Sequence, residues 1–136
     1  MRIVLDTNII VSGVLSTTGA SRALLDAARH AGLELVISPI LLAELEEVLG
    51  RFMSEGAAAE IRSAIEELAS LVAPTEVPAV ARDADDDHVL AAVVAGGPTH
   101  IVTRDKHLLS LAIYAEITIL EPAVALSVIR ADRDEA

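Results

Sequence analysis

Short apolar runs alternate with helix-like segments along most of this chain, and this alternation is the feature that most limits its fold. The apolar runs cover residues 2–5, 33–37, 100–103 and 117–120. Helical patterns cover residues 20–31, 39 to about 52, about 56–72, about 85–95, 105–115 and 122–131. Short strands that alternate with helices predict an α/β domain whose mainly parallel sheet is covered on both faces.

The length and composition fit one compact domain without a membrane span. The chain has 136 residues, of which 53% are hydrophobic, and no apolar run reaches eighteen residues. We expect one domain over residues 1–131 and a polar tail over 132–136. The sequence contains no cysteine, which excludes disulfides and thiolate metal sites and fits a cytoplasmic location. The formal net charge of −11 argues against a general nucleic-acid coat protein, because phosphate contacts need a basic surface.

Acidic residues follow several of the predicted strands. Asp6 comes directly after the first apolar run, and Asp105 follows the run at 100–103 after one intervening residue. Each acid could lie at the carboxyl edge of the sheet, where α/β folds place their sites, or could instead cap a following helix. Thr103 adds a hydroxyl at the same edge.

Two further acids lie on predicted helices, and the pattern alone leaves each choice open. Glu44 and Glu46 both fall at the borders of the apolar stripe of the helix that Ser38 and Pro39 begin, although Glu44 lies nearer the helix start. In the acidic run 83–87, both Asp86 and Asp87 project toward apolar positions. A carboxylate that faces apolar surface needs a partner.

Taken together, the four acids predict a metal site. Asp6, Asp105, one of Glu44 and Glu46, and one of Asp86 and Asp87 would converge at one edge of the sheet, where their mutual repulsion favours a hard divalent cation bound by oxygen atoms. Such ions activate water and stabilise the leaving oxygen in phosphodiester cleavage. Arg104 and Lys106 lie beside the last acid and are plausible RNA contacts.

The same residues resemble the PIN (PilT N-terminal) nuclease domain, with matching order and spacing from Arg2 to about Val124. The matching segments are Ile3-Val4-Leu5-Asp6-Thr7-Asn8, the Ser38-Pro39 helix with Glu44, Asp87-His88-Val89-Leu90-Ala91-Ala92, and Ile101-Val102-Thr103-Arg104-Asp105. The Asp-rich run before Asp87 resembles the VapC-like branch, the toxins of type II toxin–antitoxin pairs.

The resemblance implies a Rossmann-like α/β/α fold with a four- or five-stranded parallel sheet. It also implies cleavage of RNA with Mg²⁺ or Mn²⁺, and it selects Glu44 over Glu46 and Asp87 over Asp86. With Asp6 and Asp105 these complete the expected metal ligands and catalytic acids. Asn8 and Thr103 match positions that support the acids by hydrogen bonding. A homodimer and a cognate antitoxin are the implied protein partners.

Two other functions are compatible with a small acidic α/β domain. A receiver-type phosphoacceptor module should carry an acceptor Asp at the end of a middle strand, but the strand at 33–37 is followed by Ser38. A non-catalytic protein- or RNA-binding module would not need converging carboxylates. Metal-dependent cleavage, or its absence, separates that module from a nuclease.

Overall fold

A six-stranded sheet runs through the centre of the molecule. The computed structural model describes residues 1–30, 33–73, 91, 97–114 and 116–135. The strands are β1 (Arg2–Leu5), β2 (Glu34–Ile37), β3 (Ser70–Leu71), β4 (His100–Val102), β5 (Ile113–Tyr114) and β6 (Ile117–Leu120). Their order across the sheet is β3-β2-β1-β4-β6-β5, and every neighbouring pair is parallel except β5 with β6. The α/β fold class expected from the sequence is therefore confirmed.

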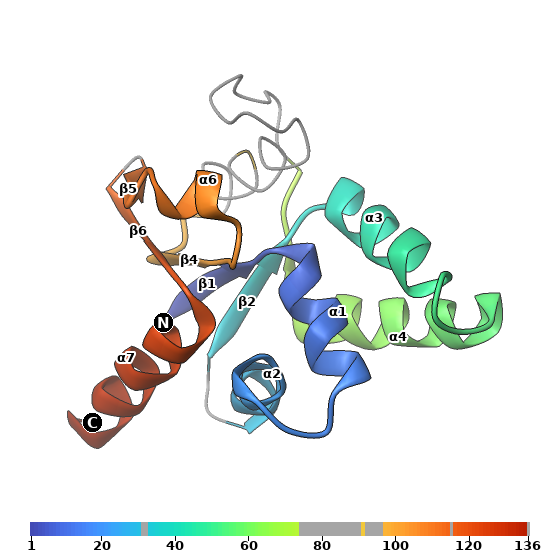
Figure 1. The fold of residues 1–136 in the computed structure, drawn as a ribbon, viewed down its shortest axis with the longest axis horizontal. Coiled ribbons are helices and arrows are strands. Elements are labelled where there is room, and N and C mark those ends of the chain that lie inside the picture. Colours follow the sequence, from blue (N-terminus) through green and yellow to red (C-terminus); the bar gives the residue numbers. More distant parts are fainter. Residues whose placement is uncertain (31–32, 74–90, 92–96, 115, 136) are drawn as a thin grey trace.

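Helices connect and surround these strands. They are α1 (Thr7–Leu15), α2 (Ala20–His30), α3 (Pro39–Leu49), α4 (Glu55–Leu68), α6 (Lys106–Leu109) and α7 (Pro122–Glu135). Figure 1 shows α2 between α1 and α7, and both neighbours contact it. On the other side of α1, α3 packs against both α1 and α4. Over the residues that the structure describes, no helix is long and apolar enough to cross a membrane.

The main strands and several helix ends lie where the sequence places them. Strands β1 and β6 coincide with their predicted ranges, and β2 and β4 agree to within a residue. Helix α3 begins at Pro39, and the Ser38 hydroxyl accepts a hydrogen bond of 3.3 Å from the backbone N–H of Leu41. This bond satisfies one of the free N–H groups of the first turn, as expected for an N-cap serine.

Some boundaries differ from the predictions. The predicted helix over 105–115 is wrong: α6 ends at Leu109 and the chain continues into the edge strand β5. Ala112 has a positive φ of 57°, which ends the helical path and turns the chain toward β6. Strand β3 was not expected, and it and β5 raise the sheet from the four or five strands expected to six.

Helix α1 was not assigned from the sequence, and three other helices end at different residues from those expected. Helix α3 ends at Leu49, before the expected Phe52, and α4 ends at Leu68, before the expected residue 72. Helix α7 continues through Glu135, beyond the expected residue 131. The connector at 74–78 and the helix predicted over about 85–95 fall almost entirely outside the described residues.

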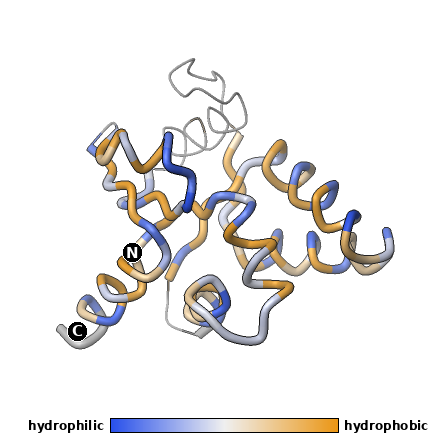
Figure 2. Tube along the Cα trace, viewed as in Figure 1, coloured by the Kyte–Doolittle hydropathy of each residue, from blue (hydrophilic) through white to orange (hydrophobic). Residues whose placement is uncertain are grey.

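The core consists of the central strands and the helix faces that cover them. Figure 2 shows the apolar segments along β1, β2, β4 and β6, and along the inner sides of the helices. Fully buried side chains at the centre include Val4, Leu24, Leu45, Ile101 and Leu108. Strands that are buried on both faces need continuous apolar runs, which explains why the sequence shows runs rather than alternation.

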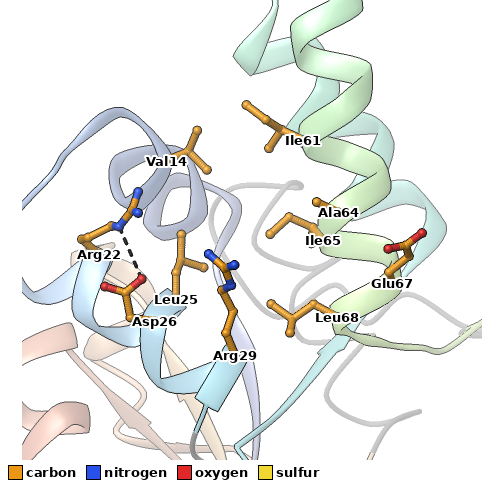
Figure 3. Close-up of a pocket in the computed structure, with 10 residues that line it drawn as sticks. All are labelled: Val14, Arg22, Leu25, Asp26, Arg29, Ile61, Ala64, Ile65, Glu67 and Leu68. Atoms are coloured by element: carbon orange, nitrogen blue, oxygen red, sulfur yellow. Dashed lines mark ion pairs between the residues drawn. The ribbon is translucent and has the colours of Figure 1, made fainter.

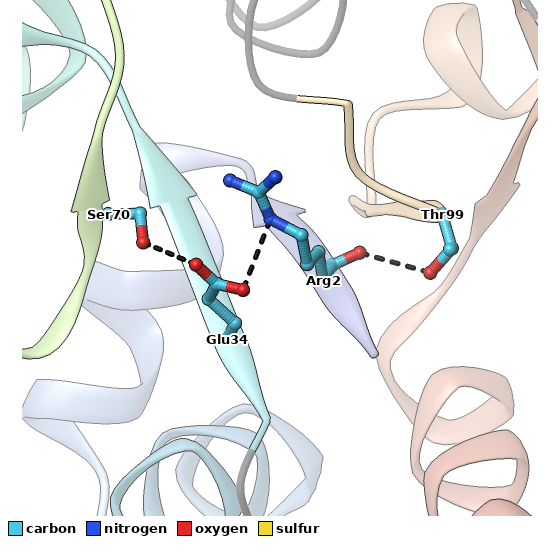
Figure 4. A network of polar contacts seen from close by, with 4 residues as sticks. All are labelled: Arg2, Glu34, Ser70 and Thr99. Carbon is cyan, nitrogen blue, oxygen red and sulfur yellow. Dashed lines mark hydrogen bonds and ion pairs between the residues drawn. The ribbon is translucent and has the colours of Figure 1, made fainter.

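The two edges of the sheet carry different polar groups. At the amino edge, Arg2 forms an ion pair of 3.2 Å with Glu34, and Glu34 accepts a hydrogen bond from the Ser70 hydroxyl (Figure 4). The Thr99 hydroxyl donates to the backbone carbonyl of Arg2 over 3.1 Å. These contacts join β1, β2, β3 and the start of β4, so this edge holds the strands together.

The carboxyl edge contains the point where the order of connections reverses. From β1 the chain proceeds outward through β2 to β3, and from β4 it proceeds in the opposite direction to β6. The neighbouring strands β1 and β4 therefore form the switch point of the sheet. Parallel α/β sheets bind ligands outside the carboxyl ends of the strands at such a point.

Candidate functional site

Asp6 lies at the switch point, at the end of β1. Its side chain is buried, with 8% of the residue exposed. Its backbone N–H donates to the carbonyl of Val102 on β4 over 3.0 Å, which fixes the end of β1 against the end of β4. One carboxylate oxygen, Oδ1, accepts the backbone N–H of Asn8 over 3.4 Å, so Asp6 is also the N-cap of α1.

Thr103 connects Asp6 with Asp105. The fully buried Thr103 hydroxyl donates a hydrogen bond of 2.8 Å to Asp6 Oδ2 and accepts one of 3.0 Å from the backbone N–H of Asp105. Its own backbone N–H donates to the Leu120 carbonyl over 3.0 Å. The residue is therefore held by β6 on one side while it orients an acid on the other.

Asp105 is less buried than Asp6 and begins α6. Its Oδ1 atom accepts the backbone N–H groups of His107, over 2.7 Å, and Leu108, over 3.3 Å. Asp105 thus caps a helix, which was the alternative role considered from its position in the sequence. The capping leaves Oδ2 with no hydrogen bond from a described residue, and this oxygen is available to a ligand.

The surroundings of Asp6 disfavour its charge. Burial raises the pKa of the Asp6 carboxyl above its ordinary value, and the negative charge of Asp105 raises it further. Hydrogen bonds from Thr103 and from the backbone N–H groups of Asn8 and Thr7 act in the opposite direction. A positive charge placed beside the two carboxylates would stabilise the ionised form of Asp6.

The other predicted site residues are placed less fully. Glu44 lies half-buried in the second turn of α3. In the described part of the chain, no three acidic, histidine or cysteine side chains are grouped closely enough to hold a metal ion. The structure therefore brings together two of the four predicted acids, Asp6 and Asp105, and does not add Glu44 to them. Asp87 lies outside the described residues.

The supporting residues differ in how they act. Thr103 contacts the acids through its hydroxyl, as expected. Asn8 is exposed and donates its backbone N–H to Asp6. Ser12 on α1 was not singled out from the sequence, and its hydroxyl accepts a hydrogen bond of 3.3 Å from Arg104 Nη1. Because α1 itself was not predicted, no periodicity pointed to Ser12.

One hollow on the described surface lies apart from these acids. A groove of about 570 Å³ opens between α2 and α4, and Figure 3 shows Leu25 and Ile65 facing each other across it. Arg22 at its rim is paired with Asp26 over 3.5 Å. None of the residues that line the groove is one of the predicted acids. The candidate site is therefore the open edge of the sheet.

The comparisons agree on the fold. A family model described as PIN domain matches residues 2–107. No curated protein matches the chain.

Three solved structures are similar to the chain. VapBC2 from Rickettsia felis, bound to a promoter DNA fragment, has 14% identity and a TM-score of 0.64, covering 89% of this chain and 98% of its own. PAE2754 from Pyrobaculum aerophilum has 12% identity and a TM-score of 0.61, and the match covers 96% of this chain and 89% of PAE2754. FitAcB from Neisseria gonorrhoeae has 18% identity and a TM-score of 0.58, and the match covers 89% of this chain and 98% of the FitAcB chain. At these identities the likeness concerns the fold.

Proposed function

The chain belongs to the PIN domain family, and from this premise we propose that it is a metal-dependent endoribonuclease that acts as the toxin of a toxin–antitoxin pair. PIN domains are generally nucleases. The observation that carries the proposal is the pair of acids at the switch point, Asp6 and Asp105, with Thr103 hydrogen-bonded to both residues. A carboxylate pair held rigidly at the edge of a parallel sheet suits the binding of a phosphodiester substrate through a cation.

The donor atoms fit a hard divalent cation. The carboxylates of Asp6 and Asp105 offer only oxygen, which Mg²⁺ and Mn²⁺ prefer. Burial, and after it the charge of Asp105, raises the pKa of Asp6, and a bound cation would offset both effects. We propose that Asp6 and Asp105 hold the cation together with Glu44 and Asp87, the two remaining predicted ligands.

We propose a separate role for each of these residues in hydrolysis. When bound, Mg²⁺ or Mn²⁺ activates a water molecule and stabilises the leaving oxygen. Asp6 and Asp105 bind the cation and fix its position, and Thr103 orients Asp6. Arg104 and Lys106 offer positive charge to the phosphates of the RNA. In the reaction, the oxygen of water bonds to phosphorus, the bond from phosphorus to a ribose oxygen breaks, and that oxygen takes up a proton.

The proposed partners follow from the family and from the relatives. Two of the similar structures are VapBC2 and FitAcB, and the former is bound to a DNA fragment from its promoter. We propose that this chain pairs with a cognate antitoxin, forms a homodimer and works in the cytoplasm.

One observation favours a second function. Within the described ranges the acids do not form a group of three metal ligands, so a non-catalytic PIN-like module that binds RNA or protein is the alternative. Such a module would bind a partner without cleaving RNA.

Cleavage of a mixed panel of structured and single-stranded RNAs tests the proposal. The wild type is compared with Asp6→Asn in Mg²⁺, in Mn²⁺ and in chelator, and Glu47→Gln serves as a matched acid-to-amide control on the exposed side of α3. We expect cleavage by the wild type and the control that requires metal, and none by Asp6→Asn. Metal-independent cleavage, or full activity of Asp6→Asn, would contradict the site assignment. A folded wild type that binds RNA without cleaving it would favour the binding module.

A further inference from the structure

Positive charge is scarce in this chain, and much of it is already neutralised. Ten lysines and arginines stand against 21 acids. Four arginines form ion pairs with acids, namely Arg2, Arg22, Arg51 and Arg62. Two basic residues that form no ion pair with a described acid, Arg104 and Lys106, flank Asp105. The carboxyl edge of the sheet therefore carries, on either side of Asp105, cations that are available to a substrate.

Arg104 is directed away from the neighbouring acids. It lies between Thr103 and Asp105 in sequence, yet its Nη1 atom donates to the Ser12 hydroxyl on α1 over 3.3 Å. The Asp6 carboxylate accepts from Thr103 and Asn8, and Asp105 Oδ1 accepts two backbone N–H groups of α6. The guanidinium forms no ion pair with either carboxylate. Figure 2 shows the hydrophilic stretch between β4 and α6 that contains it.

Ser12 lies further along α1 than Asp6 does. Asp6 caps α1, and Ser12 lies six residues further along the chain. At 1.5 Å per residue, this corresponds to about 9 Å along the helix axis. The guanidinium is bonded to this later residue of α1 and forms no ion pair with Asp6, so a phosphate next to the one at the acids is the group that it could bind.

The guanidinium has donors to spare. Arg carries five N–H donors in a planar fork, and the bond to Ser12 uses one of them. The exposed fork can therefore bind a phosphate through two parallel hydrogen bonds, as arginine does in nucleic-acid recognition.

We propose that Arg104 binds a backbone phosphate that flanks the cleaved bond, and that Ser12 is the positioning residue that holds its guanidinium over α1. The inference rests on the proposed ribonuclease function and names how that site recognises its substrate. Recognition through phosphate places no demand on base identity, so this contact supplies affinity rather than sequence preference.

The salt dependence of RNA binding tests the role of Arg104. A labelled single-stranded RNA of mixed sequence is titrated with protein in chelator, at salt concentrations from about 50 to 200 mM. We expect Arg104→Ala to reduce the slope of log affinity against log salt by about 0.7, the value for one lost phosphate contact on a single strand. Its dissociation constant should rise about tenfold. Arg104→Lys should keep the slope, because it keeps the charge, and still bind more weakly.

The positioning role of Ser12 is tested by a kinetic measurement that a purely structural role would not change. In cleavage assays with metal, Ser12→Ala should raise KM about two- to threefold and leave kcat unchanged, since it weakens substrate binding and touches no reacting atom. Ser12→Thr keeps a hydroxyl and should restore the KM. The matched control for the lost arginine is Arg130→Ala, an exposed arginine on α7.

The outcomes separate this proposal from the ribonuclease function. If the wild type cleaves RNA but Arg104→Ala and Arg130→Ala show the same salt slope as the wild type, the phosphate contact is wrong and the nuclease function stands. If Ser12→Ala and the wild type have equal KM, the positioning role is wrong. If the wild type neither binds nor cleaves any RNA in the panel, both proposals fail.

Discussion

The Thr103 hydroxyl lies 2.8 Å from Asp6 Oδ2, and this hydrogen bond joins two residues that are 97 positions apart in the sequence. It closes the gap between the ends of β1 and β4, the two strands at the switch point of the sheet. Thr103 is fully buried and Asp6 is 8% exposed, so the Thr103 hydroxyl has no water as an alternative partner. The orientation of the most buried acid therefore depends on a residue from the far end of the chain.

Replacing Thr103 with Val should damage both the fold and the site. The substitution keeps the shape but removes the donor to Asp6 and the acceptor for the Asp105 N–H. We expect a loss of about 1–3 kcal/mol in the free energy of unfolding in urea, the cost of leaving buried polar groups without partners. RNA cleavage should fall sharply at temperatures where the variant is folded. Thr103→Ser retains the hydroxyl and should remain active; equal cleavage by Ser and Val variants would refute the orienting role.

Asp6→Asn should stabilise the metal-free protein near neutral pH. Burial raises the pKa of Asp6 in the folded state above the ordinary value of 3.8, so the folded state binds the proton more tightly than the unfolded state. The stability of the wild type therefore falls as the pH rises through the raised pKa, whereas the Asn variant lacks this loss. The difference in unfolding free energy between the two proteins should be present near neutral pH and vanish below about pH 3.8. Urea unfolding across this pH range measures it, and a variant less stable than the wild type at neutral pH would contradict the prediction.

In the presence of metal, the wild type should become more stable than Asp6→Asn. A cation that binds the folded state and not the unfolded state stabilises the protein by RT ln(1 + [L]/Kd), so its melting temperature rises with metal concentration. We expect Mg²⁺ or Mn²⁺ to raise the melting temperature of the wild type and to have little effect on Asp6→Asn. This thermal measurement needs no RNA, and equal shifts in both proteins would place the metal elsewhere.

Two glutamates of α3 should respond differently to the same change. Glu46 forms an ion pair of 3.0 Å with Arg62 on α4, and both side chains are about one third exposed. Glu46→Gln should therefore cost less than about 1 kcal/mol and leave cleavage unchanged. Glu44→Gln should remove cleavage if Glu44 is a metal ligand as predicted. A large loss of cleavage in Glu46→Gln with none in Glu44→Gln would move the assignment to Glu46.

Gly13→Ala should destabilise the protein by forcing α1 and α2 apart. A Cβ at this position would lie 2.6 Å from Leu25 Cδ1 and 2.9 Å from the backbone carbonyl oxygen of Ser21. The leucine can turn, but the carbonyl is part of α2 and can move only with the helix. We expect a loss of about 1–3 kcal/mol in thermal or urea unfolding.

Gly56 provides the matched control. It lies in α4, and an added Cβ there would meet no atom within 4 Å. Gly56→Ala should leave stability unchanged or raise it by up to about 1 kcal/mol, because alanine favours the helix. A similar loss in both variants would show that the close approach at Gly13 is not the cause.

Much of the fold follows from local sequence. The apolar runs determine β1, β2, β4 and β6, because a strand buried on both faces has no room for polar residues. Ser38 and Pro39 fix the start of α3 through the chemistry of a single turn. Asp6 and Asp105 could be placed at strand ends for the same reason. These features depend on neighbours within a few residues, so the sequence alone was enough.

The sequence was a poor guide where distant contacts decide the outcome. Residues 111–114 have a helix-compatible pattern, yet the pairing of Ile113 and Tyr114 with β6 makes them a strand. Short apolar segments can adopt either structure, and the partner across the sheet decides between them.

At the candidate site too, some features follow from local sequence and others from tertiary packing. The positions of Asp6, Thr103 and Asp105 near strand ends were set by sequence, but their contacts arise from the parallel register of β1 and β4. The burial that raises the pKa of Asp6, and the bond from Arg104 to Ser12, depend on how α1 packs beside these strands. The sequence by itself determined which groups reach the carboxyl edge. Only the tertiary structure decided which of them touch, because hydrogen bonds form over about 3 Å between residues that are nearly a hundred positions apart.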